Sequence, residues 1–336
     1  INYMSNSYNG HLCIVFALEH YNPLNMIRAF GENGINPVYI SVKRRYEVAC
    51  RSKYISKLHR VDSVEEGYKL LMEEYGNMEK KPYIVFSDDK SVGYFDLHYD
   101  EWKDKFITYN AGRVGRINEF MDKYNIQQLA KKHGFNVLDS YVIGKEDPLP
   151  EQLWYPIITK DISPNSGSWK GDVFVCQNEE ELKESIKKIT SPLIMIQHFV
   201  DKQNEMALEG YTINRGKDMQ IITQMTWKYL IQGYYSPFHN VCMFTDKEME
   251  HKLQAMFEEI GFEGVFEVEF LIDKDGTFYF METNFRASAW NPTCKFAGMP
   301  LDYLWVKGME NGYIDPADRR VFEPFTSMSE VIDYGK

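Results

Sequence analysis

The sequence lacks the features by which several large protein classes are recognised. Its five cysteines form no CxxC pair and its eight histidines no HExxH pattern, so a zinc site is disfavoured. A disulfide framework is disfavoured too, because the cysteines are odd in number and far apart, and reduced thiols are the default. Acidic residues outnumber basic ones by 49 to 38, for a net charge of −11. This balance argues against nucleic-acid or anionic-membrane partners, which need a basic surface.

Long apolar runs and export signals are also missing. The longest apolar run, Leu12–Leu18, is far shorter than the ~20 residues that cross a bilayer. No leader with a charged and then an apolar region opens the chain, so we expect a cytoplasmic protein without a membrane partner.

The two commonest nucleotide fingerprints are absent as well. After the first apolar run the sequence reads FALEHYNPL, without GxGxxG, and GxxxxGK[ST] does not occur. If this protein binds a nucleotide, it must hold it by another arrangement.

Apolar runs alternate with helical spacing in the first hundred residues. Strands are expected at 12–18, 36–42, 55–61 and 82–89, and helices at 24–30 and 65–75. This order predicts an open parallel α/β sheet. Asp88 and Asp89 end the last strand, at the edge where ligands of such sheets bind. Equally, Asp88 and Asp89 could cap the next element and have no role in ligand binding.

A long helical stretch and a compact loop-rich region follow. Helical spacing runs over Arg113–His133, with Lys123 off the main apolar stripe. Strands 155–160 and 172–177 flank the loop DISPNSGSWKG, in which backbone N–H groups could wrap a polyphosphate. A flexible surface loop is the alternative. Next come a capped helix from Asn178 and a strand at 192–200.

The strongest pattern lies in residues 262–286, FEGVFEVEFLIDKDGTFYFMETNFR. Two strands flank the turn DKDG, and an even-numbered connection would pair Glu269 with Phe280. Side-chain alternation then gathers on one face Glu267, Glu269, Glu282 and Asn284. Carboxylates on a half-buried face repel one another, and Mg²⁺ or Mn²⁺ relieves that cost. Arg286 adds a cation suited to phosphoryl chemistry, whereas the alternative is an exposed hairpin with ordinary surface charges.

These segments, in this order, resemble the ATP-grasp superfamily, most closely its carboxylate–amine (amino-acid) ligases. METNFR resembles the family's metal motif, which would give Glu269, Glu282 and Asn284 to Mg²⁺ (or Mn²⁺) and Arg286 to the acyl-phosphate as a catalytic residue. Lys228 is a weaker catalytic candidate. The loop after Lys160 has fewer glycines than in many members, so its closure can differ.

The resemblance also implies a nucleotide site for ATP. Its residues would be Lys123, Lys160, Ser166, Gly167, Ser168, Gln197, His198, Val200 and Glu205. The two lysines would contact the phosphates, Gln197 the adenine amino group, the backbone around His198–Val200 the ring edge, and Glu205 the ribose.

The fold that the resemblance implies is α/β, with an α+β C-terminal part. It would comprise an N-terminal α/β domain (1–112), an ATP-grasp domain (113–320) with a lid at about 145–200 and a metal-bearing antiparallel sheet, and a tail (321–336). The implied reaction joins a small-molecule carboxylate to an amine through an acyl-phosphate, releasing ADP and phosphate, and a homodimer is compatible with it. A non-catalytic nucleotide-binding module and a carbamoyl-phosphate or carboxylase-type enzyme are the alternatives.

Overall fold

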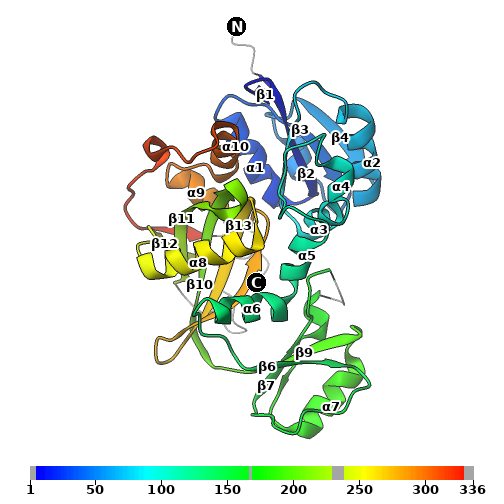
Figure 1. The fold of residues 1–336 in the computed structure, drawn as a ribbon, viewed down its shortest axis with the longest axis vertical. Coiled ribbons are helices and arrows are strands. Elements are labelled where there is room, and N and C mark those ends of the chain that lie inside the picture. Colours follow the sequence, from blue (N-terminus) through cyan, green and yellow to red (C-terminus); the bar gives the residue numbers. More distant parts are fainter. Residues whose placement is uncertain (1–4, 166–168, 229–237, 329–336) are drawn as a thin grey trace. The chain divides into compact units, whose positions relative to one another are not determined.

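The computed structural model describes residues 5–165, 169–228 and 238–328 of the 336-residue chain (Figure 1). It separates into two compact units. Unit 1 comprises Ile1–Asn118, Ala207–Glu267 and Asn284–Lys336, and unit 2 comprises Glu119–Met206 and Val268–Thr283. The functional boundaries expected at residues 112 and 320 stay predictions. Within the described ranges, no helix combines the length and the apolar character needed to span a membrane.

Unit 1 begins with a five-stranded sheet. Its strands are β1 (Ser7–Tyr8), β2 (His11–Leu18), β3 (Val38–Val42), β4 (Lys57–Val61) and β5 (Tyr83–Phe86). β2 pairs in parallel with both β3 and β5, β3 pairs in parallel with β4, and β1 is antiparallel to β2. Every residue of β3 and β5 is buried, as expected for strands covered on both faces. The predicted open parallel α/β sheet is confirmed.

Helices connect the strands of this sheet. They are α1 (Tyr21–Gly31), the 3₁₀ turn η1 (Ala49–Arg51), α2 (Val64–Tyr75), α3 (Asp89–Leu97) and α4 (Tyr99–Trp102). α1 and α3 pack on β2, and α2 packs on β3 and β4 (Figure 1). Asp88 caps α3 by accepting from the Ser91 N–H, which confirms the capping alternative for that residue.

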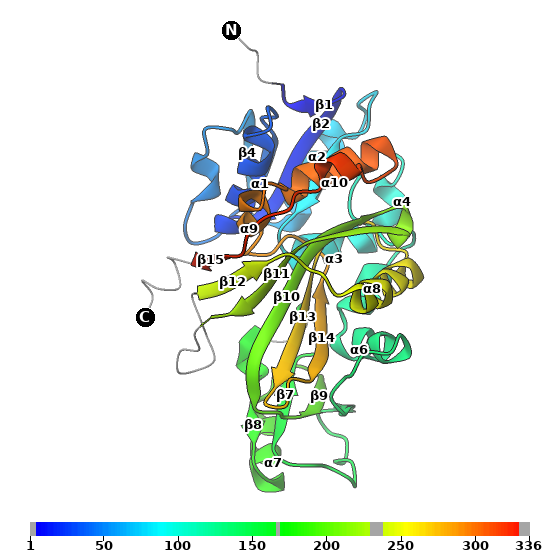
Figure 2. The ribbon, with the colours of Figure 1, turned by 90° about the vertical axis from the view of Figure 1, so that its left-hand side faces the viewer.

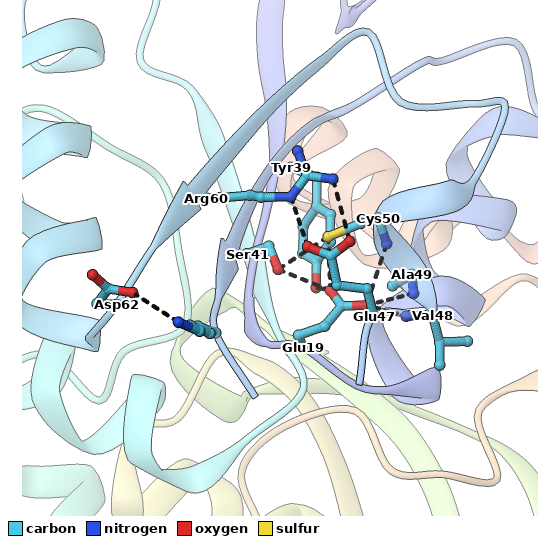
Figure 3. A network of polar contacts seen from close by, with 10 residues as sticks. Glu19, Tyr39, Ser41, Glu47, Val48, Ala49, Cys50, Arg60 and Asp62 are labelled. Atoms are coloured by element: carbon cyan, nitrogen blue, oxygen red, sulfur yellow. Dashed lines mark hydrogen bonds and ion pairs between the residues drawn. The ribbon is translucent and has the colours of Figure 1, made fainter. Parts of the chain in front are cut away.

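A buried carboxylate fixes the loop that follows β3 (Figure 3). Glu19, only 2% exposed at the end of β2, accepts hydrogen bonds from the Tyr39 hydroxyl at 2.6 Å and the Ser41 hydroxyl at 2.8 Å. The backbone N–H groups of Val48 and Ala49 donate to its other oxygen, each at 2.6 Å. Burial opposes ionisation, but these hydrogen bonds outweigh it, so the pKa of Glu19 lies below its ordinary value.

The rest of unit 1 lies in the second half of the chain. It contains η3 (Asn214–Gly216), β11 (Asp218–Trp227), β12 (Phe238–Cys242), α8 (Lys247–Ile260), α9 (Pro292–Phe296), α10 (Leu301–Asn311), η4 (Pro316–Asp318) and β15 (Phe325–Met328). Asp246 caps α8 at its start, and Gly261 ends it in the left-handed conformation with φ +78°.

Unit 2 contains a smaller antiparallel sheet. Its elements are α6 (Lys123–Lys132), β6 (Ser140–Gly144), β7 (Ile157–Lys160), η2 (Trp169–Asp172), β8 (Val175–Cys176), α7 (Glu179–Lys188) and β9 (Leu193–His198). The strand order is β6-β9-β7-β8. Asn178 caps α7 by accepting from the Glu181 N–H, as the sequence predicted, and the Glu181 carboxylate accepts from the N–H of Gln177, the residue before the cap. Isoleucines of β7 and β9 form a core with Leu182.

The boundaries between the two units fall within three strands and one helix. These elements are β10 (Lys202–Ile213), β13 (Gly264–Asp273), β14 (Phe278–Asn284) and α5 (Arg116–Met121). The strands belong to a six-stranded sheet with the order β14-β13-β10-β11-β12-β15 (Figure 2).

The helix expected over Arg113–His133 is two helices. α5 ends at Met121, and α6 starts anew at Lys123. Asp122 lies between them in an extended conformation, and its side chain accepts from the Asn125 N–H. Aspartate competes for backbone N–H groups in this way, so a pattern of apolar residues alone does not reveal the break. The break places Lys123 in the first turn of a helix.

The Glu19 network generates a stability prediction. Glu19→Gln replaces a carboxylate oxygen by an amide N–H₂ that cannot accept from Val48, Ala49 or the hydroxyls. We expect a loss of about 2 kcal/mol in the free energy of unfolding at pH 7, measured by urea denaturation. Since the folded-state pKa is depressed, the stabilisation is present above pH ~4.5 and is lost as the pH falls.

Glu73→Gln on α2 is the matched control for this prediction, because Glu73 is exposed. It should change stability by less than about 0.5 kcal/mol. An equal effect of the two substitutions would contradict the role of Glu19.

Candidate active site

Lys123 brings a cation next to a carboxylate of β14. Its ammonium nitrogen lies 3.5 Å from Glu282 Oε2, and both side chains are mostly buried. The Glu282 carboxylate raises the pKa of Lys123 against the effect of burial, and Glu269 raises it further. Lys123 therefore stays charged at neutral pH, with the three carboxylates of Glu282, Glu269 and Asp161 in its electrostatic range.

Lys160 is the second cation of this cluster. It ends β7, and its ammonium donates to Gln197 Oε1 at 2.8 Å. Burial lowers the pKa of Lys160 to about 8, the charge of Lys123 lowers it as well, and the carboxylates of Glu282 and Glu205 oppose this. Two ammonium groups in range of each other and of several carboxylates form a cluster suited to a ligand with both phosphates and metal ions.

A chain of two buried amides supports Lys160. Gln197 receives the lysine at its oxygen, and its Nε2 donates to Gln127 Oε1 at 2.8 Å. Gln127 Nε2 then donates to the backbone oxygen of Met281 at 2.8 Å. Since lysine can only donate, the direction of every bond in the chain is determined. The amides are at most 1% exposed, so the chain connects Lys160 to the residue before Glu282 without water.

The remaining predicted nucleotide residues that the structure describes lie in the same unit. Glu205 on β10 pairs with Lys202 at 2.6 Å, and burial raises the pKa of this carboxyl. His198 ends β9, and its backbone N–H donates to Asp139 O, while Val200 follows the strand. Ser166, Gly167 and Ser168 lie outside the described residues.

Arg286 is held in unit 1 by the predicted rim residue Asp89. Two guanidinium nitrogens of Arg286 each lie 3.2 Å from an oxygen of Asp89, a planar two-point contact. A further bond at 3.2 Å goes to Asn284 Oδ1, and Asn284 Nδ2 donates to Glu267 Oε1 at 3.1 Å.

Behind this group lies a buried pair of carboxyl groups. Glu209 is fully buried and Glu267 is 4% exposed. Burial and then the neighbouring Glu267 raise the pKa of Glu209 well above its ordinary value, and the Ser288 hydroxyl also donates to Glu209. The raised pKa favours the neutral form of Glu209, while Glu267 accepts from Asn284, which in turn accepts from Arg286.

The hairpin of β13 and β14 has a different register from the predicted one. The Asp273 N–H donates to Thr277 O at 3.1 Å, so the connection has three residues, with Gly276 at φ +80°. Phe280 consequently packs on Phe270, with ring centroids 5.6 Å apart, and not beside Glu269. The even-numbered connection was wrong.

The expected meeting of Glu267 and Asn284 nevertheless occurs. Phe270 and Phe280 share one face, and so do Glu267 and Asn284, although regular alternation would not allow both pairs. One strand therefore carries an irregularity between the two contacts, of the kind that a β-bulge produces.

Lys228, the weaker catalytic candidate, belongs to unit 1. It follows β11, is exposed, and donates from its ammonium to Thr326 Oγ1 on β15 at 3.1 Å. Its catalytic role stays a prediction.

Two known proteins are similar in sequence to about half of this chain. D-alanine–D-alanine ligase of Fusobacterium nucleatum is 28% identical over 172 residues, which cover 49% of this chain and 55% of that protein. N5-carboxyaminoimidazole ribonucleotide synthase of Staphylococcus haemolyticus is 26% identical over 171 residues, covering 49% and 44%. The match thus spans about half the length of these curated relatives. No protein-family model matches the chain.

Solved structures resemble almost the whole chain. L-amino acid ligase from Bacillus licheniformis superposes with a TM-score of 0.69 at 12% identity, covering 90% of this chain and 77% of that one. N5-carboxyaminoimidazole synthetase from Staphylococcus aureus gives 0.68 at 16% identity, covering 99% and 97%. Biotin carboxylase from Campylobacter jejuni gives 0.70 at 17% identity, covering 94% and 74%. The chain has the ATP-grasp fold.

The structure contains three features of the candidate site that the sequence did not predict. Gln127, Glu209 and the pairing of Asp89 with Arg286 were not predicted. Gln127 looks like an ordinary polar residue of an amphipathic helix, and only its burial reveals its role. Glu209 is the one charged residue in the second half of β10, ALEGYTI (207–213), and this was a signal that could have been noticed.

The oxygen donors of the predicted metal residues Glu269 and Glu282 are of a kind that suits a divalent metal ion. Glu269 and Glu282 both act on the Lys123 ammonium, so their carboxylates share one neighbourhood, and oxygen ligands suit Mg²⁺ or Mn²⁺. Among the residues with described positions, no three or more His, Cys, Asp or Glu side chains group as a metal site. Ligand phosphates would therefore have to complete the coordination.

The electrostatic environment of Lys160 predicts its titration. With a pKa of about 8 the ammonium is charged at pH 7 and loses its proton as the pH rises through 8. NMR of lysines labelled with ¹³C at Cε should show one resonance titrating there, absent in Lys160→Met. Lys123→Met should raise this pKa, because it removes the repelling charge, whereas Lys183→Met on exposed α7 should not. Titration of Lys160 near its ordinary value of ~10.4 would contradict this.

The amide chain predicts a cost for Gln127→Leu. This change leaves the buried Gln197 Nε2 without the acceptor Gln127 Oε1 and removes the hydrogen bond to Met281 O, so the free energy of unfolding should fall by about 2 kcal/mol or more. The neighbouring Gln128 is exposed on the same helix, and Gln128→Leu serves as the control in the same urea titration. Equal stability of the two variants would exclude a structural role for the chain of amides.

Proposed function

We propose that this protein is an ATP-dependent ligase that joins a small-molecule carboxylate to an amine through an acyl-phosphate, releasing ADP and phosphate. The observation that carries the proposal is the cluster of Lys123, Lys160, Glu269 and Glu282, which brings together the residues expected to bind phosphates and metal. The sequence relationship to D-alanine–D-alanine ligase, an enzyme named for forming such a bond, supports it.

In this proposal the two lysines bind the phosphates of ATP. Lys123 lies in the first turn of α6, and the Glu282 carboxylate raises its pKa and so favours its charged form. Lys160 is directed by the buried Gln197, and phosphate oxygens would raise its lowered pKa and keep it protonated. The backbone around His198–Val200 and the carboxylate of Glu205 would receive the adenine and the ribose.

Glu269, Glu282 and Asn284 would hold Mg²⁺ or Mn²⁺. The metal would neutralise phosphate charge and align the phosphoryl group for transfer. The lysines would then let the substrate carboxylate approach the γ-phosphorus, since they reduce the repulsion between two anions.

Arg286 is suited to stabilise the charge of the acyl-phosphate and of the tetrahedral species formed when the amine attacks. Its guanidinium keeps a fixed plane because Asp89 and Asn284 hold it. Preorganised donors of this kind lower a barrier without having to reorganise during the reaction. The scheme needs no covalent enzyme nucleophile, since ATP activates the carboxylate.

A second candidate uses bicarbonate as the acid. The similarity to N5-carboxyaminoimidazole synthetase from Staphylococcus aureus covers nearly all of both chains, which favours considering it. Bicarbonate-dependent ATP hydrolysis without another acid would distinguish this carboxylase-type activity from ligation.

A screen for ADP release tests the proposal. With Mg²⁺ and ATP, pairs of carboxylic acids and amines should release ADP only when both partners are present. Glu282→Gln should reduce the turnover about 10²–10³-fold, because it weakens metal binding and removes charge next to Lys123.

Glu180→Gln, on exposed α7 of the same unit, should retain activity. Full activity of Glu282→Gln would reject the metal assignment. Nucleotide-dependent stabilisation with no ADP from any pair, and none with bicarbonate, would favour a non-catalytic binding module.

A further inference from the structure

The carboxyl edge of the parallel sheet in unit 1 carries a basic loop that the proposed function has not used. The loop, residues 43–48, follows β3 and contains three consecutive cations, Lys43, Arg44 and Arg45, all exposed. In a chain with a net charge of −11, such a run is a local exception.

The loop is held at both ends. At its start, the Lys43 N–H donates to Val61 O at 2.9 Å, which continues the pairing of β3 with β4. At its end, the buried Glu19 carboxylate accepts from the Val48 and Ala49 N–H groups (Figure 3). The arginines are therefore presented from a fixed backbone and not from a free surface segment.

The nearby acidic groups do not neutralise the two arginines. Glu47, the acid within the loop, pairs with Arg60 at 2.7 Å, and Asp62 lies 3.9 Å from Lys43. Arg45 lies over the Tyr46 ring. In the parts of the chain that the structure describes, no carboxylate forms an ion pair with Arg44 or Arg45. An anion can bind there without first displacing a protein partner.

The sheet register places this loop close to Arg286. Leu18 of β2 is level with Val42 of β3, and the Leu18 N–H donates to Asp88, directly after β5. β3 and β5 flank β2, and neighbouring strands are about 4.8 Å apart, so the two strand ends are roughly 10 Å apart. The end of β3 leads to the basic loop, and the end of β5 leads to the Asp89–Arg286 pair.

Arg44 lies within electrostatic range of His20, in the middle of this edge. Burial lowers the pKa of His20, which follows β2, and the positive charge of Arg44 lowers it further, so the two side chains are in electrostatic range. His20 also precedes α1, whose first turn has no acidic residue. The N–H groups of that turn add partial positive charge at the same edge.

We propose that the basic loop binds a second anionic group of the carboxylate substrate, which is therefore an acid with an additional carboxylate or phosphate. The proposal rests on the proposed ligase function. The reacting carboxylate would lie near Arg286, and the second anion near Arg44 and Arg45, a separation that a small diacid or a phosphorylated acid can span.

Substrate preference gives the first test. ADP release is measured with dicarboxylic acids of three to six carbons, with phosphorylated carboxylic acids, and with monocarboxylic acids of the same lengths. One dianionic class should show a kcat/KM about ten- to a hundredfold above its matched monoacids, and which class does so identifies the second group. Equal use of monoacids would overturn the proposal.

Loop variants give the second test. Arg44→Gln and Arg45→Gln should each raise the KM for the preferred acid about tenfold or more, with little change in kcat or in the use of monoacids. Lys53→Gln removes an exposed cation of the same unit and should leave these constants unchanged. Unaltered KM values in both arginine variants would overturn the proposal.

Direct binding separates failure of the site from failure of the ligase function. Calorimetric titration with the same acids, without nucleotide, is carried out on the wild type and on the double variant Arg44→Gln/Arg45→Gln. If no acid–amine pair releases ADP but a dianionic acid binds the wild type and not the double variant, the anion site stands and the ligase function fails. Equal binding to both, or no binding to the wild type in any assay, overturns the site.

Discussion

Two lysine side chains in electrostatic range of each other impose the main constraint on unit 2. Burial and mutual repulsion both disfavour the charged forms, and the structure answers this differently for each. Lys123 has a carboxylate at 3.5 Å, whereas Lys160 has the neutral amide of Gln197 and a pKa lowered to about 8. The phosphate-bearing ligand that we propose would satisfy both ammonium groups at once.

In unit 1, by contrast, the positive group Arg286 is fully held by polar contacts within the protein. Arg286 is fixed by Asp89 and by Asn284, and Asn284 is fixed by Glu267. Glu267 shares its burial with Glu209, whose raised pKa favours the neutral form of that group. Buried polar chains of this type are stable only when every member finds a partner, so they specify one geometry. The guanidinium is thereby held in one orientation, as its proposed role in stabilising the charge of the acyl-phosphate requires.

The carboxyl edge of the parallel sheet contains both a buried carboxylate and exposed cations. Glu19 is ionised and buried, and it is stabilised by hydroxyl and backbone donors, which fixes the loop after β3. That loop exposes arginines which the acidic residues around it do not pair. A carboxylate used as a structural anchor thus leaves neighbouring cations available for a ligand. The overall negative charge of the chain says little about such a local arrangement.

Local sequence patterns determined much of this protein. Apolar runs predicted β2, β3 and β5, and capping residues predicted the start of α7, because strand burial and helix caps depend on residues close in the chain. The order of the motifs, with Lys123, Lys160, Glu282 and Arg286, was sufficient to suggest the ATP-grasp fold. Tertiary structure decided what those residues contact. Gln127 meets Gln197 across 70 positions of sequence, and Glu209 meets Ser288 across 79. The hairpin register depended on one residue in the turn, Gly276, whose conformation made the connection odd. Contacts between distant segments arise only when the chain packs, and no local periodicity encodes them.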